Sequence, residues 1–282
     1  MRLDLTYHGH HIEGGGGTEL YVESTGDSAN PAIVFMHGFC QCRLSWDVQF
    51  QSELAREFHL VRYDIRGHGL SGKPADPAAF QDTKAWADDL DAVIRSFKLD
   101  KPVLCGWSYG GYMICDYIRH YGQERIGGLN FVDAVTEMGS EAALAMFGTE
   151  LVDIVGDLLS AEAARVSEGL QQFIGMATYE PLDPYTFYLL LGYNSIVPPH
   201  VRQAMFSRKL DNTEILKSIR VPALVTRGEN DRLVNAGAAD HIARHVKGAE
   251  RKTYPKCGHV PFVEKGEQFN RDLAAFARKC AK

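Results

Sequence analysis

The chain of 282 residues carries little basic charge and no long hydrophobic segment. Its 30 lysine and arginine residues are outnumbered by 36 aspartate and glutamate residues, which gives a net charge of −6. Because nucleic acids and anionic membranes favour basic surfaces, this balance argues against both as partners. A membrane-spanning helix needs about 18 consecutive apolar residues, and no run in the sequence approaches that length.

The N-terminal segment, residues 1–17, also lacks the apolar stretch and small-residue cleavage site of a secretory signal peptide. Without an export signal we expect a soluble cytoplasmic protein with reduced thiols, since its six cysteines show no zinc-site spacing. His8, His10 and His11 lie close together, but no carboxylate or cysteine frame accompanies them. The sequence therefore predicts an exposed arm there, with no metal site, and no cofactor for the protein.

Short apolar runs alternate with segments of helical period through most of the chain. The pattern predicts strands at residues 32–36, 58–63, 102–105, 126–132, 221–226 and 250–255, the first two of which are apolar runs typical of buried strands. The helical segments lie at 86–97, 109–121 and 236–247, with a last helix carrying Phe262, Phe269, Leu273 and Phe276 on one face. Residues 20–23 resemble an antiparallel hairpin strand that follows a turn at 14–17. Such alternation is typical of right-handed βαβ connections in a mostly parallel sheet.

Residues 135–215 interrupt this alternation because they contain no buried-strand run. Their pattern predicts helices around 141–159, 161–175 and 184–193. We therefore predict an α/β core formed by residues 1–134 and 216–282, with a helical cap, or lid, at 135–215. The cap is rich in apolar and aromatic side chains, most of them expected in the cap interior and some facing the active site. They include Met146, Phe147, Phe173, Ile174, Met176, Tyr185, Phe187 and Tyr188.

Residues 106–110 read Gly-Trp-Ser-Tyr-Gly, a G-x-S-x-G pattern between a predicted strand and a predicted helix. A serine in such a sharp turn has a strained backbone, which requires neighbours without a Cβ two positions before and after it. The turn would hold the Ser108 hydroxyl at a helix N-terminus, where the helix dipole favours developing negative charge. Ser108 is therefore the predicted nucleophile.

Together with other motifs, this pattern gives the chain a resemblance to the α/β-hydrolase family. The motifs are His37-Gly38-Phe39, DIRGHGLS at 64–71, GWSYG at 106–110, GEND at 228–231 and GHVP at 258–261. The chain resembles most the cofactor-free esterases, lactonases and non-heme haloperoxidase-like hydrolases. The resemblance implies an α/β-hydrolase fold, with a mostly parallel, eight-stranded-type sheet flanked by helices. Epoxide hydrolases and haloalkane dehalogenases use aspartate where this chain has Ser108.

A serine hydroxyl needs a positioned base, and a histidine base needs a carboxylate that fixes its tautomer. His259 follows the predicted strand at 250–255 and comes after the acid in chain order, as the family requires. We assign His259 as the base and Asp231 as the acid, with Asp133 as an alternative acid after the preceding strand. His37 and His68 are expected to have structural roles.

The resemblance also implies that the backbone N–H groups of Phe39 and Tyr109 form an oxyanion hole. The family often has proline after the first of these positions, whereas this chain has Cys40. Phe39, Trp107 and Val260 are predicted to line the substrate pocket. We also expect Asp64 and Arg66 to form an ion pair.

The leading hypothesis is a serine hydrolase that cleaves a small uncharged ester or lactone through an acyl-enzyme. Alternatives are a carbon–carbon bond or enol-lactone hydrolase of aromatic catabolism, and a haloperoxidase or perhydrolase side activity. A ligand receptor built on the same fold is an alternative from another class. A nucleotide-binding loop is excluded at residues 67–74, because Pro74 occupies the position that must offer a hydroxyl to Mg²⁺. The expected partner is a small-molecule substrate, and a homo-oligomer is possible.

Overall fold

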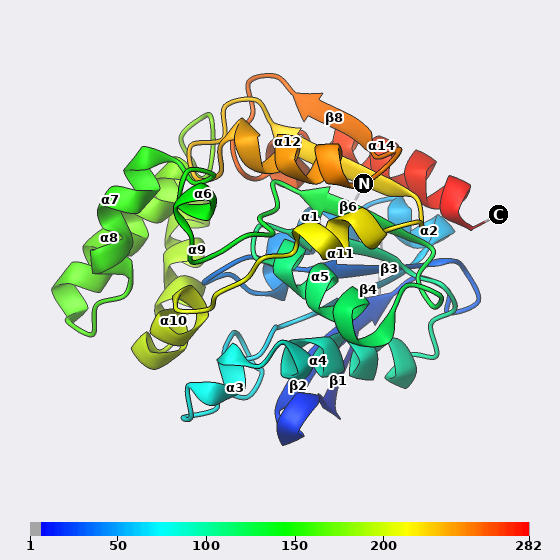
Figure 1. Cartoon of the computed structure of the whole chain (residues 1–282), viewed down its shortest axis with the longest axis horizontal. Helices are drawn as coiled ribbons and strands as arrows, with labels where there is room; N and C mark the ends of the chain where they lie inside the picture. The colour runs from blue at the N-terminus through cyan, green and yellow to red at the C-terminus, as the bar shows by residue number, and fades with distance from the viewer. Residues whose placement is uncertain (1–6, 282) are drawn as a thin grey trace.

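The computed structural model describes residues 7–281, which form an eight-stranded sheet with helices on both faces (Figure 1). The strands lie in the order β1-β2-β4-β3-β5-β6-β7-β8. Strand β1 pairs antiparallel with β2, and β2 with β4, whereas all other neighbours are parallel. Their bounds are β1 His8–Glu13, β2 Glu19–Thr25, β3 Ala32–Met36, β4 His59–Tyr63, β5 Val103–Trp107, β6 Gly128–Val132, β7 Ala223–Gly228 and β8 Glu250–Tyr254. The predicted fold class is confirmed.

The helices of the core include those predicted at 86–97, 109–121 and 236–247, together with the short helices α1, α2 and α3, which the sequence pattern did not predict. They are α1 Asp47–Phe50, α2 Leu54–Glu57, α3 Ala78–Gln81, α4 Thr83–Ser96, α5 Gly110–Tyr121, α12 Ala236–His245, α13 Pro261–Glu264 and α14 Gly266–Cys280. The predicted last helix is divided, since Phe262 lies on α13 and Phe269 on α14. No helix in the described part of the chain is long and apolar enough to cross a membrane.

Both faces of the sheet are buried, which explains why its central strands are continuous apolar runs. Along β3, Val34 and Met36 pack into one hydrophobic cluster with residues of α4 and α5. Ile33 and Phe35, which point to the opposite face, pack into a second cluster with residues of α1, α2, α13 and α14. This two-sided burial holds the strand ends, and the loops that follow them, in a rigid frame.

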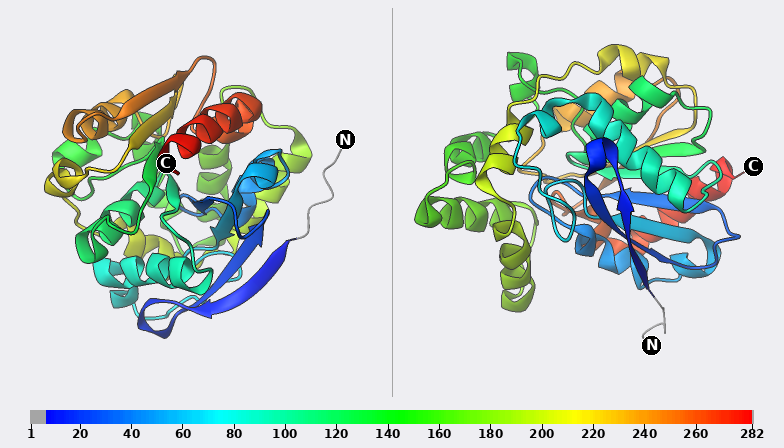
Figure 2. Two further views of the ribbon diagram at one scale, coloured as in Figure 1. Left: turned by 90° about the vertical axis from the view of Figure 1, so that its right-hand side faces the viewer. Right: turned by 90° about the horizontal axis from the view of Figure 1, so that it is seen from below.

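Six helices, α6 to α11, lie between β6 and β7. Their bounds are α6 Glu141–Leu144, α7 Thr149–Leu158, α8 Ala163–Met176, α9 Pro184–Ser195, α10 Pro199–Phe206 and α11 Thr213–Ser218. Helices α7 to α10 lie together to one side of the sheet, at the left of Figure 1, and α7 and α8 project from the core in the right panel of Figure 2. Tyr185 and Tyr188 on α9 are 78% and 68% exposed, so these two members of the apolar and aromatic set lie outside the cap interior.

The helix predicted at 141–159 is instead the pair α6 and α7, because the chain makes a close backbone approach between them. The Gly148 N–H donates to the Leu233 carbonyl at 2.9 Å. A Cβ on Gly148 would lie 1.8 Å from the Arg232 carbonyl oxygen, so only glycine fits at this contact. The break therefore joins the helical insertion to the loop that follows β7.

Two further expectations are corrected by the core. Asp64 accepts hydrogen bonds from the Arg43 backbone N–H at 2.7 Å and from its Nη1 at 2.9 Å, and does not pair with Arg66. Arg66 forms a buried ion pair with Asp89 instead, at 2.7 Å. The histidine-rich segment at 8–13 is an ordered edge strand, β1, where His10 and His11 are exposed. Strand β1 pairs with β2 and completes the hairpin, of which the sequence had predicted only the strand at residues 20–23 (Figure 2).

Candidate active site

Ser108 lies at the turn between β5 and α5, with a backbone φ of 54°. This left-handed conformation is unfavourable for a residue with a Cβ and marks a strained turn. A Cβ on Gly106 would lie 2.7 Å from the Gly110 carbonyl oxygen, so the turn requires glycine at 106. The requirement at Gly110 is milder, since a Cβ there would lie 3.1 Å from the Met36 oxygen.

Asp231 and His259 meet beyond the carboxyl ends of β7 and β8. The His259 Nδ1 lies 2.6 Å from the Asp231 Oδ2, and the two side chains are 3% and 0% exposed. The Asp231 Oδ1 accepts the backbone N–H groups of Leu233 and Val234 at 2.8 and 3.0 Å. Because Nδ1 is bonded to Asp231, Nε2 is the imidazole nitrogen that can accept a proton from a neighbouring group or donate one to it.

The loop of His259 is held from two directions. Its backbone N–H donates to the Ala177 carbonyl, beyond α8, at 2.8 Å. The Trp107 Nε1 donates to the His259 carbonyl at 2.8 Å. The imidazole position therefore depends on the helical insertion as well as on the core.

The loop after β3 lies directly against Ser108. A Cβ on Gly38 would lie 3.0 Å from the Ser108 Cβ. The His37 Nδ1 lies 2.9 Å from the Gly38 carbonyl oxygen, and its Nε2 accepts the Ile65 backbone N–H at 3.1 Å. Because C=O and N–H of one trans peptide point in opposite directions, this bond directs the Phe39 N–H away from His37.

Cys40, at the position where the family resemblance would lead us to expect proline, has a φ of 59° and donates its backbone N–H to the His68 Nε2 at 3.2 Å. Proline allows neither that φ nor that hydrogen bond, so this loop is built differently from a proline-containing one. Burial lowers the pKa of both His37 and His68 to about 3, so both rings are neutral at neutral pH. Their structural roles agree with the prediction.

Ser108 and His259 line one small cavity of about 30 Å³, together with Phe39 and Tyr109. The remaining lining residues are Tyr112, Val135, Met138, Phe147, Leu151, Phe173, Phe206, Leu233 and Val234. The sequence had singled out only Phe147 and Phe173 among these, within a larger set of cap residues. The others carry no distinguishing pattern, because apolar residues at helical and loop spacing are the same whether they face a core or a ligand.

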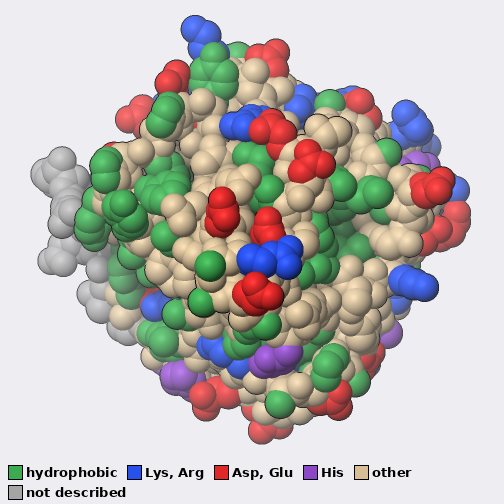
Figure 3. Space-filling model, turned by 90° about the vertical axis from the view of Figure 1, so that its left-hand side faces the viewer, with side chains coloured by type: hydrophobic (Ala, Val, Ile, Leu, Met, Phe, Trp, Pro, Cys, Tyr) green, Lys and Arg blue, Asp and Glu red, His purple; other side chains and the backbone are tan. Residues whose placement is uncertain are grey.

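A larger cavity of about 420 Å³ adjoins the first. The two cavities share Met138, Phe147, Leu151 and Phe206 as lining residues, so these four side chains, called the neck below, lie between them. Among the described residues that line the larger cavity, Glu141 alone is charged. The face that carries α7 and α8 has exposed hydrophobic side chains among charged ones (Figure 3).

Of the residues predicted to line the substrate pocket, Phe39 alone lines the cavity of Ser108. Trp107 and Val260 line a separate apolar cavity of about 290 Å³, between α9 and the core. The Trp107 ring packs edge-on against Phe262, with centroids 4.9 Å apart, and its centroid lies 5.5 Å from that of the His259 ring.

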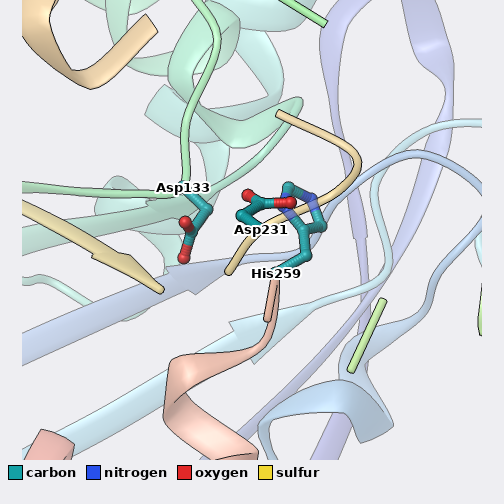
Figure 4. A group of neighbouring side chains, drawn as sticks. All are labelled: Asp133, Asp231 and His259. Carbon is teal, nitrogen blue, oxygen red and sulfur yellow. The ribbon is translucent and has the colours of Figure 1, made fainter. Parts of the chain in front are cut away.

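Asp133 lies beside Asp231 and His259, in the loop after β6 (Figure 4). Within residues 7–281, this is the one group of three side chains whose ligand-type atoms all lie within 4.8 Å of one another. Asp231 already binds two backbone N–H groups and the imidazole of His259, so the group is a hydrogen-bonded cluster.

The fold and this site define the class of protein. A family description, the alpha/beta hydrolase family, matches residues 33–272, and the chain belongs to that family. A crystal structure from Burkholderia cenocepacia, named for aryl esterase activity, is 31% identical with a TM-score of 0.87, covering 97% of this chain and 99% of that one. An esterase from a Rhodococcus strain is 29% identical with a TM-score of 0.89, covering 96% and 98%. A non-heme chloroperoxidase of Burkholderia pyrrocinia is 28% identical, covering 92% and 96%.

Proposed function

We propose that this protein is a carboxylic ester hydrolase that cleaves a small uncharged ester through an acyl-enzyme on Ser108. The observation that carries the proposal is the shared cavity of Ser108 and His259, with His259 bonded to Asp231 at 2.6 Å on its far side. Relatives named as esterases, at 29% and 31% identity over nearly the whole chain, support the enzyme class.

In the proposed mechanism, His259 Nε2 takes the Ser108 proton as the serine Oγ attacks the ester carbonyl carbon. Asp231 fixes the tautomer with the proton on Nδ1 and stabilises the imidazolium that forms. The negative oxygen of the tetrahedral intermediate accepts hydrogen bonds from the backbone N–H groups of Phe39 and Tyr109. His259 then protonates the leaving alcohol, and a water molecule hydrolyses the acyl-enzyme by the same steps. A lactone would follow the same path with the alcohol still attached.

The two adjoining cavities support a substrate with one short side and one larger apolar side. A cavity of about 30 Å³ at the nucleophile leaves room for a group of one or two heavy atoms without movement of the neck. The outer cavity of about 420 Å³ could take the larger part by apolar contact. Glu141 at its lining disfavours an anionic substrate, since like charges would meet there.

Two ester series with a common member test this proposal. In one, the p-nitrophenyl group is constant and the acyl chain grows from acetate to decanoate; in the other, the acetyl group is constant and the alcohol grows. We expect kcat/KM to rise by up to about fourfold per methylene, or ~0.8 kcal/mol, in one series and to fall early in the other. Equal preference for charged acyl groups would contradict the proposal.

Labelling with a fluorophosphonate identifies the nucleophile independently of the substrate. We expect one label on Ser108, and loss of both label and turnover in Ser108→Ala. A label on another serine would overturn the assignment. Stoichiometric labelling of Ser108 without turnover of any ester, lactone or vinylogous diketone would favour a receptor role on the same fold.

A further inference from the structure

Asp133 is a buried carboxyl group that the proposed reaction does not use. It follows β6 directly, has a φ of 40°, and is 3% exposed. Its backbone N–H donates to the Thr226 carbonyl at 2.8 Å, so the side chain is held over the end of β7. The Gly228 N–H, at that end, donates to both Asp133 carboxyl oxygens, at 3.0 and 3.3 Å. The strained backbone and these bonds fix the carboxyl group beside Asp231 (Figure 4).

Two buried carboxyl groups this close cannot both carry a negative charge. Ligand-type atoms of Asp133, Asp231 and His259 all lie within 4.8 Å of one another. Across residues 7–281, no lysine or arginine forms an ion pair with either aspartate. Like charges at this distance, away from water, force one carboxyl group to keep its proton.

The hydrogen bonds decide which group keeps the proton. Asp231 receives three donors, the N–H groups of Leu233 and Val234 and the Nδ1–H of His259, all of which stabilise its ionised form. Asp133 receives only the shared N–H of Gly228. Burial, and after it the charge of Asp231, raises the pKa of Asp133 well above its ordinary value.

Other ionisable groups facing Asp133 do not take over this role. Burial raises the pKa of Tyr254 and of Cys257, so both stay neutral. Arg227 favours an ionised Asp133, but its guanidinium lies against the Glu229 carbonyl, at 3.3 Å. None of these three groups therefore takes the proton from the cluster of the two aspartates and His259, and it stays on Asp133.

We propose that Asp133 is a protonated positioning residue, whose carboxyl O–H donates a hydrogen bond to the Asp231 carboxylate and holds it toward His259. The functional part of this inference rests on the proposed roles of Asp231 and His259. In that reaction Asp133 touches no substrate. It supplies a fourth hydrogen bond to Asp231 and keeps the acid ionised while the imidazole gains and loses its proton.

Stability measurements test the position of the proton without any substrate. A group whose folded pKa is raised is protonated in the folded state at pH values where the unfolded chain has lost that proton, so stability falls as pH rises above about 3.8. Asp133→Asn removes this loss and keeps a residue type that tolerates positive φ. We expect the ratio of unfolding constants, wild type over variant, to rise up to tenfold per pH unit between pH 4.5 and 7.5.

The matched control for that measurement is Asp153→Asn, which removes one exposed carboxyl group on α7. Its ratio to the wild type should change far less with pH. A ratio for Asp133→Asn that is independent of pH would mean that Asp133 is ionised in the folded protein, and would overturn the proposal whether or not the chain is an esterase.

Kinetics test the positioning role. Asp133→Asn can still donate to Asp231, so we expect kcat within about threefold of the wild type at neutral pH, and no alkaline decline from loss of the Asp133 proton. Asp133→Ala cannot donate, and should lower kcat at least tenfold with little change in KM. A loss in Asp133→Asn as large as that in Asp231→Asn would make Asp133 the acid instead, and equal kcat in the alanine variant would overturn its role.

Discussion

The His259 Nδ1 and the Asp231 Oδ2 lie 2.6 Å apart, although 28 residues separate them in the chain. They meet because β7 and β8 are parallel neighbours whose last residues, Gly228 and Tyr254, are paired in register. A Cβ on Gly228 would lie 1.8 Å from the Gly258 carbonyl oxygen, so the two loops approach as closely as backbone allows. The acid and the base therefore lie on two loops that the paired ends of β7 and β8 bring together.

Replacing Asp231 with asparagine is expected to lower kcat by about 10⁴, because asparagine can hold the imidazole in the wrong tautomer. The same change at the exposed Asp153 should leave kcat unaltered. Steady-state kinetics on a p-nitrophenyl ester measures both variants. A loss below tenfold in Asp231→Asn would show that another carboxyl group supports His259.

Gly106→Ala should disrupt the turn that presents Ser108, since its Cβ would lie 2.7 Å from the Gly110 carbonyl oxygen and backbone cannot give way cheaply. We expect a loss of ~1–3 kcal/mol in the free energy of unfolding and at least 100-fold in kcat. Gly192→Ala in α9 is the matched control, because a Cβ there meets no atom within 4 Å. It should stabilise the protein by ~0.5–1 kcal/mol. Denaturant unfolding and kinetics check both, and an active, stable Gly106→Ala would contradict the strained-turn argument.

Phe147→Ala should widen the neck between the two cavities, because Phe147 lines both. We expect kcat/KM for long acyl chains to rise about tenfold relative to acetate, as more methylenes reach apolar surface near Ser108. Leu144→Ala, a residue that lines only the outer cavity and is 53% exposed, is the control. The acyl series described above provides the measurement. If both variants change chain-length preference equally, the neck does not limit access.

The buried histidines should make the protein less stable in acid. The pKa of His37 and His68 is about 3 in the folded state, against an ordinary value of 6.5, because burial disfavours the charged ring. The unfolded chain therefore binds protons first, and each ring lowers the free energy of unfolding by up to ~1.4 kcal/mol per pH unit as pH falls from 6.5 toward 3.

Glutamine at position 37 or 68 removes one titrating ring, so the pH dependence of stability between pH 4 and 6 should become shallower by about one proton. Urea unfolding at a series of pH values measures this slope. His10→Gln, at an exposed histidine on β1, should leave the slope closer to that of the wild type. An unchanged slope in the His37 variant would mean that its ring is charged in the folded protein.

Local sequence patterns and the family resemblance together predicted the fold class, and they singled out Ser108, Asp231 and His259 as candidate nucleophile, acid and base. Apolar runs identified the buried strands because both faces of the sheet are covered. The turn at Ser108 is recognisable because its geometry demands glycine at Gly106, whatever surrounds it. Each of these features is imposed by a requirement that acts within a few residues, and such requirements leave a mark on local sequence.

Tertiary packing determines which residues line the pocket, which charged residues form ion pairs and the environment of the Asp133 carboxyl group. The pairings Asp64–Arg43 and Arg66–Asp89 replace the expected pair of near neighbours, since buried charges bond to whichever partner the fold brings within reach. Trp107, which precedes Ser108 in the chain, lines a different cavity from that of Ser108. The sequence predicts Asp133 only as an alternative acid. Its burial beside Asp231, which raises the pKa of its carboxyl group, follows from the tertiary structure. Contacts between distant segments leave no local pattern, because any residue of suitable size and charge can make them.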